Sequence, residues 1–256
     1  MKRIICLLLI AVLLLGGCAK EEPQPEQTAA PIATETPQPS PEPTPEHSEL
    51  YIPGLELEQV LEYFNEVVLD VEYSDGTGDV TLMQKWKMPL RYRIYGEPTD
   101  EDWAMLSLLF EQLNRVPGFP GISAAEDGKA ENLSFSFTDG ASMNESFREI
   151  LGGEWSNGAT QFWYYTDTNE MYDARIGYRS DIDQASRSSI LLEEVINTLG
   201  ITDTVLREDS IVYQYSDDNL SLSQIDWLIL KLLYNPDIEC GMDKDACAAV
   251  IAELYY

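Results

Sequence analysis

Oxygen-bearing side chains are concentrated near the end of a predicted helix over residues 183–199. Glu193 and Asn197 are four positions apart, so on a helix their side chains lie on one face. Gly200 follows the helix, and Asp203 comes after the turn that this glycine permits. Carboxylate and amide oxygens are hard ligands, which suit Ca²⁺ or Mn²⁺ better than Zn²⁺. The spacing therefore makes Glu193, Asn197 and Asp203 candidate ligands for a divalent cation.

Histidine occurs once in the chain, at position 47, before the predicted globular part at residues 50–256. Imidazole is a zinc ligand, and it is the base of Ser-His-Asp and Cys-His sites. The globular part therefore cannot build any of these sites unless a partner supplies the imidazole.

Residues 188–242 have an order of helix, glycine, turn and helix that resembles the core of the metzincin zinc peptidases. The resemblance rests on Glu-Glu-Val-Ile-Asn-Thr-Leu-Gly, on Ser-Ile-Val-Tyr at residues 210–213, and on a later helix with Asp226 and Tyr234. The segment looks still more like an uncharacterised bacterial family of zincin-like domains, which carry Glu-Glu-Leu-x-Gln-x-Leu-Gly and a later Leu-Tyr-Asp-Pro. Outside these residues, the resemblance rests mainly on the order of elements.

Metzincins carry His-Glu-x-x-His on this helix and a third histidine after the glycine. The resemblance assigns the three ligand positions to Glu193, Asn197 and Asp203, and the catalytic glutamate to Glu194. All three histidines are thus replaced, and Val212 occupies the position of the methionine in the turn. The resemblance implies a degenerate zincin-like domain with no peptidase activity.

Two roles for these residues remain open, besides a chance match of short amphipathic helices. Glu193, Glu194 and Asn197 could make hydrogen bonds that fix their helix to the edge of a sheet. Alternatively, Glu193, Asn197 and Asp203 could form a repurposed metal site with oxygen ligands. We expect no cofactor, and an oxygen-ligated divalent cation is the alternative.

The start of the chain predicts export and a lipid anchor. Met1-Lys2-Arg3 precedes a short apolar run over residues 4–15, which is typical of a secretory signal and too short to span a bilayer. Leu15-Gly16-Gly17-Cys18 resembles the lipobox of bacterial lipoproteins. The resemblance implies a signal peptide at residues 1–17 and a diacylglyceryl group on Cys18. It also implies a location on the outer face of the cytoplasmic membrane of a Gram-positive bacterium. The alternative is an ordinary signal peptide with an incidental cysteine.

Residues 18–49 predict a disordered tether, because they are rich in Pro, Glu and Thr and poor in large apolar side chains. The whole chain has 45 acidic and 16 basic residues, a net charge of −29. Such a charge argues against nucleic acid as a partner and against docking on an anionic membrane surface. We expect contact with the membrane through the lipid alone, and an unknown protein or cell-wall partner.

The globular part contains two cysteines, Cys240 and Cys247. An even pair in an exported domain predicts a disulfide. Two free thiols are the alternative.

Apolar periodicity predicts an α+β domain with a small mixed sheet. The predicted helices are residues 55–69, 99–115, 142–151, 183–199, 223–234 and 243–254, and the predicted strands are 90–95, 132–138, 161–166 and 173–178. The composition and motifs together predict a catalytically inactive binding or interaction module. A hydrolase of peptides or glycans that uses an oxygen-ligated metal is the alternative.

Overall fold

The computed structural model describes residues 48–69, 81–152, 156–216 and 218–256. The predicted signal peptide, Cys18, His47 and nearly all of the predicted tether lie outside the described residues. The chain divides into two units, Met1–Thr44 and Pro45–Tyr256, and the described helices and strands all belong to the second. No helix among the described residues is long and apolar enough to cross a membrane.

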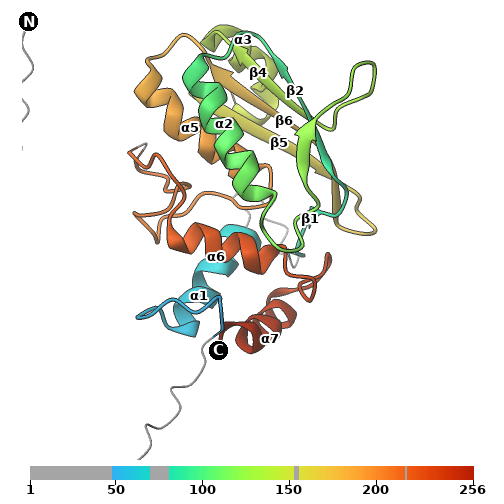
Figure 1. Ribbon diagram of the computed structural model, residues 1–256, viewed down its shortest axis with the longest axis vertical. Coiled ribbons are helices and arrows are strands. Elements are labelled where there is room, and N and C mark those ends of the chain that lie inside the picture. Colours follow the sequence, from blue (N-terminus) through green and yellow to red (C-terminus); the bar gives the residue numbers. More distant parts are fainter. Residues whose placement is uncertain (1–47, 70–80, 153–155, 217) are drawn as a thin grey trace, which may run out of the picture. The chain divides into compact units, whose positions relative to one another are not determined.

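A mixed sheet forms the centre of this unit (Figure 1). Its strands are β1 (Lys85–Trp86), β2 (Leu90–Tyr95), β3 (Ile122–Ala124), β4 (Leu133–Thr138), β5 (Gly158–Tyr164) and β6 (Glu170–Arg179). They are ordered β5-β6-β4-β2-β3, and β1 pairs with the first residues of β6. All pairs are parallel except β5 with β6, in which Thr160 lies opposite Ile176. The sheet therefore has an antiparallel edge at β5.

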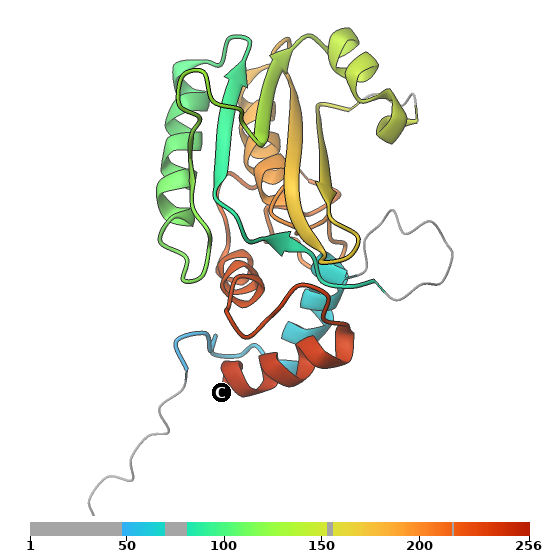
Figure 2. The same cartoon turned by 90° about the vertical axis from the view of Figure 1, so that its right-hand side faces the viewer.

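The two faces of the sheet carry different helices. α2 (Asp100–Leu113) and α5 (Gln184–Asn197) cover one face, where Phe135 of β4 contacts Phe110 of α2 and Tyr178 of β6 donates a hydrogen bond to the Leu191 carbonyl of α5. In Figure 2, α5 lies behind the strands. On the opposite face, Phe147 lies against Gly177, between α3 (Gly140–Ser146) and α4 (Arg148–Leu151).

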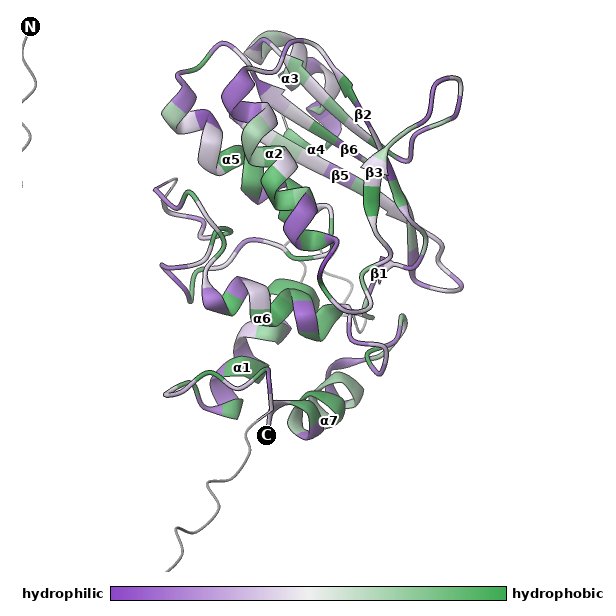
Figure 3. Cartoon of the chain, in the orientation of Figure 1, coloured by the Kyte–Doolittle hydropathy of each residue, from purple (hydrophilic) through white to green (hydrophobic). Residues whose placement is uncertain are grey.

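A second group of helices lies at the end of the sheet near β1 (Figures 1 and 2). It comprises α1 (Leu57–Phe64), the π-helical turn η1 (Asn65–Leu69), α6 (Gln224–Leu233) and α7 (Lys244–Tyr255). Figure 3 shows long hydrophobic stretches on α6 and α7. Their buried side chains join those beneath the sheet in one hydrophobic core, which holds Phe64, Ile229 and Ile251 as well as Phe135.

Lys85 fixes the end of α6 against β1. Its side chain is buried, and Nζ donates hydrogen bonds to the carbonyls of Leu233 at 3.0 Å, Asn235 at 3.2 Å and Ile238. Leu233 is the last residue of α6, and Asn235 and Ile238 follow it, so these carbonyls have no partner within the helix. Burial lowers the pKa of the Lys85 ammonium to about 8. This lysine therefore has a structural role in capping a helix.

The disulfide predicted between Cys240 and Cys247 is wrong, because both thiols are free. Cys240 lies in the turn before α7, and its Sγ donates to the Lys85 carbonyl at 3.7 Å. Cys247 lies in α7 and is fully buried in the hydrophobic core. The second alternative, two free thiols, describes this region.

Most predicted elements are confirmed within two or three residues. Thr99 and Asp243, the first residues of two predicted helices, cap α2 and α7 and accept hydrogen bonds from the amides of Asp102 at 3.1 Å and Ala246 at 2.9 Å. The predicted helix over 142–151 is divided into α3 and α4 at Phe147. β1 and β3 have two and three residues and were missed, because strands this short show no alternation of burial.

A buried ion pair joins the first turns of α2 and α5. Arg187 donates to Asp102, which is 0% exposed. Asp102 also accepts from the Thr99 amide at 2.9 Å and from Gln184 Nε2 at 2.8 Å. Every charge in this pair is therefore compensated, although neither side chain reaches water freely.

Asp102→Ala should lower the free energy of unfolding by about 3–5 kcal/mol, because it leaves the Arg187 guanidinium buried and unpaired. Urea denaturation measures this change. Glu111→Ala is the matched control, since it breaks the exposed pair between Glu111 and Arg115 on the same helix. The control should change the free energy by no more than about 0.5 kcal/mol. Equal effects of the two substitutions would contradict the role of Asp102 in joining the helices.

Candidate functional site

The predicted site residues lie on the last turns of α5 and in the loop after it. α5 begins after Asp183, whose side chain accepts from the Ser186 amide at 3.1 Å, and its C-cap is Thr198. Gly200 follows with φ +95°, and a Cβ there would lie 3.0 Å from the Gln84 carbonyl oxygen. Both the left-handed conformation and the close approach favour glycine. The predicted break at Gly200 is thus confirmed.

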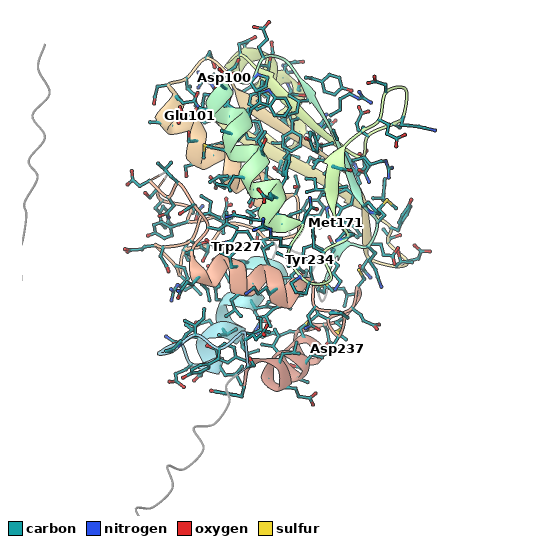
Figure 4. All side chains as sticks on the ribbon, viewed as in Figure 1. Asp100, Glu101, Met171, Trp227, Tyr234 and Asp237 are labelled. Atoms are coloured by element: carbon teal, nitrogen blue, oxygen red, sulfur yellow. The ribbon has the colours of Figure 1, made fainter. Side chains whose placement is uncertain are left out.

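Two side chains hold the carboxyl end of α5. Trp86 Nε1 donates to the Thr198 carbonyl at 2.7 Å, and Tyr234 Oη donates to the Leu199 carbonyl at 3.1 Å. Tyr234 lies at the end of α6 (Figure 4), and both rings are buried. These donors satisfy carbonyls that a helix leaves unpaired, so the end of α5 is fixed to β1 and α6.

The loop that contains Asp203 is anchored to η1. The Thr202 amide donates to the Val67 carbonyl at 2.7 Å. Glu66 accepts from Thr204 Oγ1 at 2.5 Å and from the Val205 amide at 3.0 Å. Residues on either side of Asp203 are therefore tied to a neighbouring element, which holds this loop beside the end of α5.

β5 lies directly against α5 at one close contact. Thr160 Oγ1 lies 2.5 Å from Glu194 Oε2 and 3.0 Å from the Glu194 carbonyl oxygen. A Cβ at Gly158 would lie 2.5 Å from Glu194 Oε1 and 2.5 Å from a methyl carbon of Ile190. The absence of a side chain at residue 158 is therefore what allows the edge strand to approach the helix.

A cavity of about 750 Å³ opens between these elements, and we call it the α5–β5 cavity. Its lining comprises residues 149–151, residues 156–162, Ile190, Glu193, Glu194, Asn197, Thr202 and Asp203. All four positions predicted from the sequence, Glu193, Glu194, Asn197 and Asp203, thus line one cavity. None of the described residues lining it is Lys, Arg or His.

Glu194 is the most buried carboxyl group of this cavity, with 8% of the residue exposed. Burial raises the pKa of its carboxyl to about 8, the hydrogen bond from Thr160 lowers it, and the charge of Asp203 raises it. Glu194 also makes the contact to a sheet edge that one of the sequence alternatives expects. A second carboxylate and burial therefore favour the neutral form of this group.

Asn197 and Asp203 face each other across the turn at Gly200. Asn197 Nδ2 lies 3.4 Å from Asp203 Oδ1, so the amide donor is directed at the carboxylate. Asn197 Oδ1 is shielded from solvent and has no hydrogen-bond partner among the described residues. A buried amide oxygen without a donor is uncommon in folded proteins.

Within the described part of the chain, no three His, Cys, Asp or Glu side chains are close enough together to hold a metal ion. Two roles were predicted from the sequence, a metal site with oxygen ligands and a set of hydrogen bonds to a sheet edge, and the shared cavity is compatible with both. The hydrogen bond between Thr160 and Glu194 is the contact that the second role expects.

The turn at residues 210–213 is organised by a carboxylate that sequence reasoning assigned only by resemblance. Asp226 accepts from Ser210 Oγ at 2.6 Å and from the Ile211 amide at 3.1 Å. Tyr63 Oη donates to Ser210 Oγ at 2.8 Å. Burial raises the pKa of Asp226, and its hydrogen bonds to Ser210 and Ser223 lower it. This buried network supports the turn and lies away from the cavity lining.

Sequence reasoning missed the β5 side of the cavity. Gly158 and Thr160 lie just before the predicted strand over residues 161–166, and their partner Glu194 lies 36 and 34 positions further along the chain. The isolated glycine at the start of the strand was the available sign, since glycine within a strand often marks a close backbone approach.

A family model described as "Protein of unknown function (DUF2927)" matches residues 57–253, which is most of the chain. This match includes all of the described cavity lining and all helices but the last two residues of α7. No curated protein and no solved structure matches the chain.

Glu194→Gln should stabilise the protein more at pH 9 than at pH 5. The pKa of Glu194 is raised from 4.5 to about 8 on folding, so the native state holds this proton more tightly and wild-type stability falls as pH rises through this window. Because glutamine cannot ionise, Glu194→Gln should raise the free energy of unfolding, relative to wild type, by roughly 2–4 kcal/mol more at pH 9 than at pH 5. Urea denaturation at the two pH values measures the difference.

Glu62→Gln is the matched control, since Glu62 is an exposed glutamate in α1. Because the Glu62 side chain is exposed, the substitution should change the free energy of unfolding by no more than about 0.5 kcal/mol at either pH. A Glu194→Gln effect that is equally independent of pH would contradict the raised pKa.

Proposed function

The chain belongs to the DUF2927 family of proteins of unknown function, and from this premise we propose that it is a catalytically inactive binding module. The α5–β5 cavity is its binding site. The observation that carries the proposal is the convergence of Glu193, Glu194, Asn197 and Asp203 on one cavity that has no imidazole. A cavity of about 750 Å³ is within the usual size range for small-molecule sites.

The zincin-like scaffold is part of the proposal. It rests on the sequence resemblance of residues 188–242 to metzincins, in which the helix, the glycine and the Asp226 turn keep their order. A zinc peptidase needs imidazole ligands to hold the metal that lowers the pKa of the attacking water. Glu194 in this chain instead bonds Thr160 and has a raised pKa, which suits a buried neutral group better than a base.

The proposed location is the outer face of the cytoplasmic membrane of a Gram-positive bacterium, through a lipid on Cys18. It rests on Leu15-Gly16-Gly17-Cys18 and on the Pro-rich residues that follow. Two acyl chains give stable anchoring, whereas one chain gives marginal binding. The domain would then contact a protein or a cell-wall component outside the cell.

The rival function is hydrolysis of a peptide or a glycan with an oxygen-ligated metal. The contact between Asn197 and Asp203, both candidate ligands, is the observation that favours it. Such a site would need a third oxygen donor from Glu193 and a bound divalent cation.

Zinc content and peptidase activity separate the proposal from catalysis. The full-length chain should contain substoichiometric zinc and should not cleave a mixed peptide library, with or without added Zn²⁺, Ca²⁺ or Mn²⁺. Inductively coupled plasma mass spectrometry and peptide mass spectrometry measure these quantities. Metal-dependent cleavage that Glu194→Gln abolishes would overturn the proposal.

Cys18→Ala should abolish lipid modification and move the protein from the membrane fraction to the soluble fraction. Cys6→Ala is the matched control, because Cys6 lies in the predicted signal peptide and should leave both properties unchanged. Intact mass spectrometry and cell fractionation provide the two readouts. Retention of the lipid in the Cys18→Ala protein would show that another residue is modified.

A further inference from the structure

We propose that the α5–β5 cavity binds a primary ammonium group carried on an apolar stem. This inference rests on the proposed function, because it names the class of ligand that the binding module takes. It is carried by a carboxyl oxygen of a buried glutamate and by a buried amide oxygen, neither of which has a donor among the described residues.

The first of these oxygens belongs to Glu194. The residue is more than nine-tenths buried, and it lines the cavity. Its Oε2 is engaged by Thr160 at 2.5 Å, whereas no described residue donates to Oε1. A ligand ammonium that donates to this carboxyl group would gain a charge-assisted hydrogen bond.

The second oxygen belongs to Asn197, one turn further along the same helix. Its Nδ2 faces Asp203 Oδ1, an acceptor, and this fixes the orientation of the amide. Asn197 Oδ1 is therefore the orphan atom, shielded from solvent and without a described donor. Residues 194 and 197 are three apart, so their side chains lie on one face of α5. The site thus offers acceptors and requires a ligand rich in donors.

The charge of the cavity lining indicates the charge of the ligand. Four acids line the cavity, Glu149, Glu193, Glu194 and Asp203, and no basic residue is among the described lining. A cleft lined by one sign of charge concentrates ligands of the opposite sign. An anionic ligand such as a phosphate would meet no counter-charge at this site.

The apolar part of the lining distinguishes an organic cation from a metal ion. Ile150, Leu151, Phe162 and Ile190 line the same cavity as the carboxylates. These apolar side chains cannot ligate a metal ion, and no three acids among the described residues lie close enough together to hold one. An ammonium on a stem of several methylenes satisfies both parts, because the stem packs against these side chains while the head donates.

Lysine and norleucine derivatives provide the matched probes. Nα-acetyl-lysine methylamide and Nα-acetyl-norleucine methylamide share a similar apolar stem and differ chiefly in the terminal ammonium. Isothermal titration calorimetry of the full-length chain, at pH 9 and constant ionic strength, should show saturable binding of the lysine derivative, because the Glu194 carboxyl group is then ionised while the ammonium keeps its charge. The norleucine derivative should bind at least tenfold more weakly.

Glu194→Gln should weaken binding of the lysine derivative at least tenfold, while Glu62→Gln, an exposed glutamate in α1, should leave it unchanged. Circular dichroism of both variants checks that the fold is kept.

Pentylamine tests the source of the ammonium. Binding equal to that of the lysine derivative supports a free amine, and weaker binding supports a side chain within a peptide.

Three results would overturn the inference. They are no binding of either derivative, equal binding of both, and stoichiometric binding of Ca²⁺ or Mn²⁺ that depends on Glu194. None of these three results involves catalysis, so they leave open the proposed binding function, which zinc content and peptidase activity test separately. Conversely, cleavage of the lysine derivative would overturn the proposed function itself.

Discussion

The carboxyl end of α5 is the point on which the architecture of the cavity depends. Trp86 from β1 and Tyr234 from the end of α6 donate to its last carbonyls, and Gly200 turns the chain away at once. A helix end is otherwise a weak point, because its carbonyls lack partners. Because α5 is held by both residues, the position of Asn197 is fixed. The loop with Asp203 then lies beside η1, where the Thr202 amide donates a hydrogen bond to the Val67 carbonyl.

The contact of α5 with the antiparallel edge strand then gives the cavity its electrostatic character. Gly158 allows β5 to approach so closely that Glu194 is taken out of water, and Thr160 supplies one hydrogen bond to its carboxyl group. Burial and nearby negative charge then raise the pKa of this group. The same packing leaves Asn197 Oδ1 without a donor among the described residues. The helix therefore keeps polar acceptors in a place where an apolar residue would pack at less cost, which is a feature typical of binding sites.

The sequence predicted the local elements well and the contacts between distant elements poorly. α5, Gly200 and the shared location of Glu193, Glu194, Asn197 and Asp203 followed from periodicity and from one resemblance, because they lie within a short segment. The ion pair of Arg187 with Asp102 and the contact of Thr160 with Glu194 join residues far apart in the chain, and no local pattern encodes such pairs. The disulfide expectation failed for a similar reason, since cysteine parity says nothing of how Cys247 faces the core.

A crystal structure of the full-length chain with Nα-acetyl-lysine methylamide tests the central claim most directly, namely that the α5–β5 cavity is a binding site without catalytic metal. The account predicts one ligand in the cavity, with its ammonium within hydrogen-bond distance of the Glu194 carboxyl group and its stem against Phe162 and Ile190. A metal ion held by Glu193, Asn197 and Asp203, or a ligand bound elsewhere with the cavity holding only water, would contradict it.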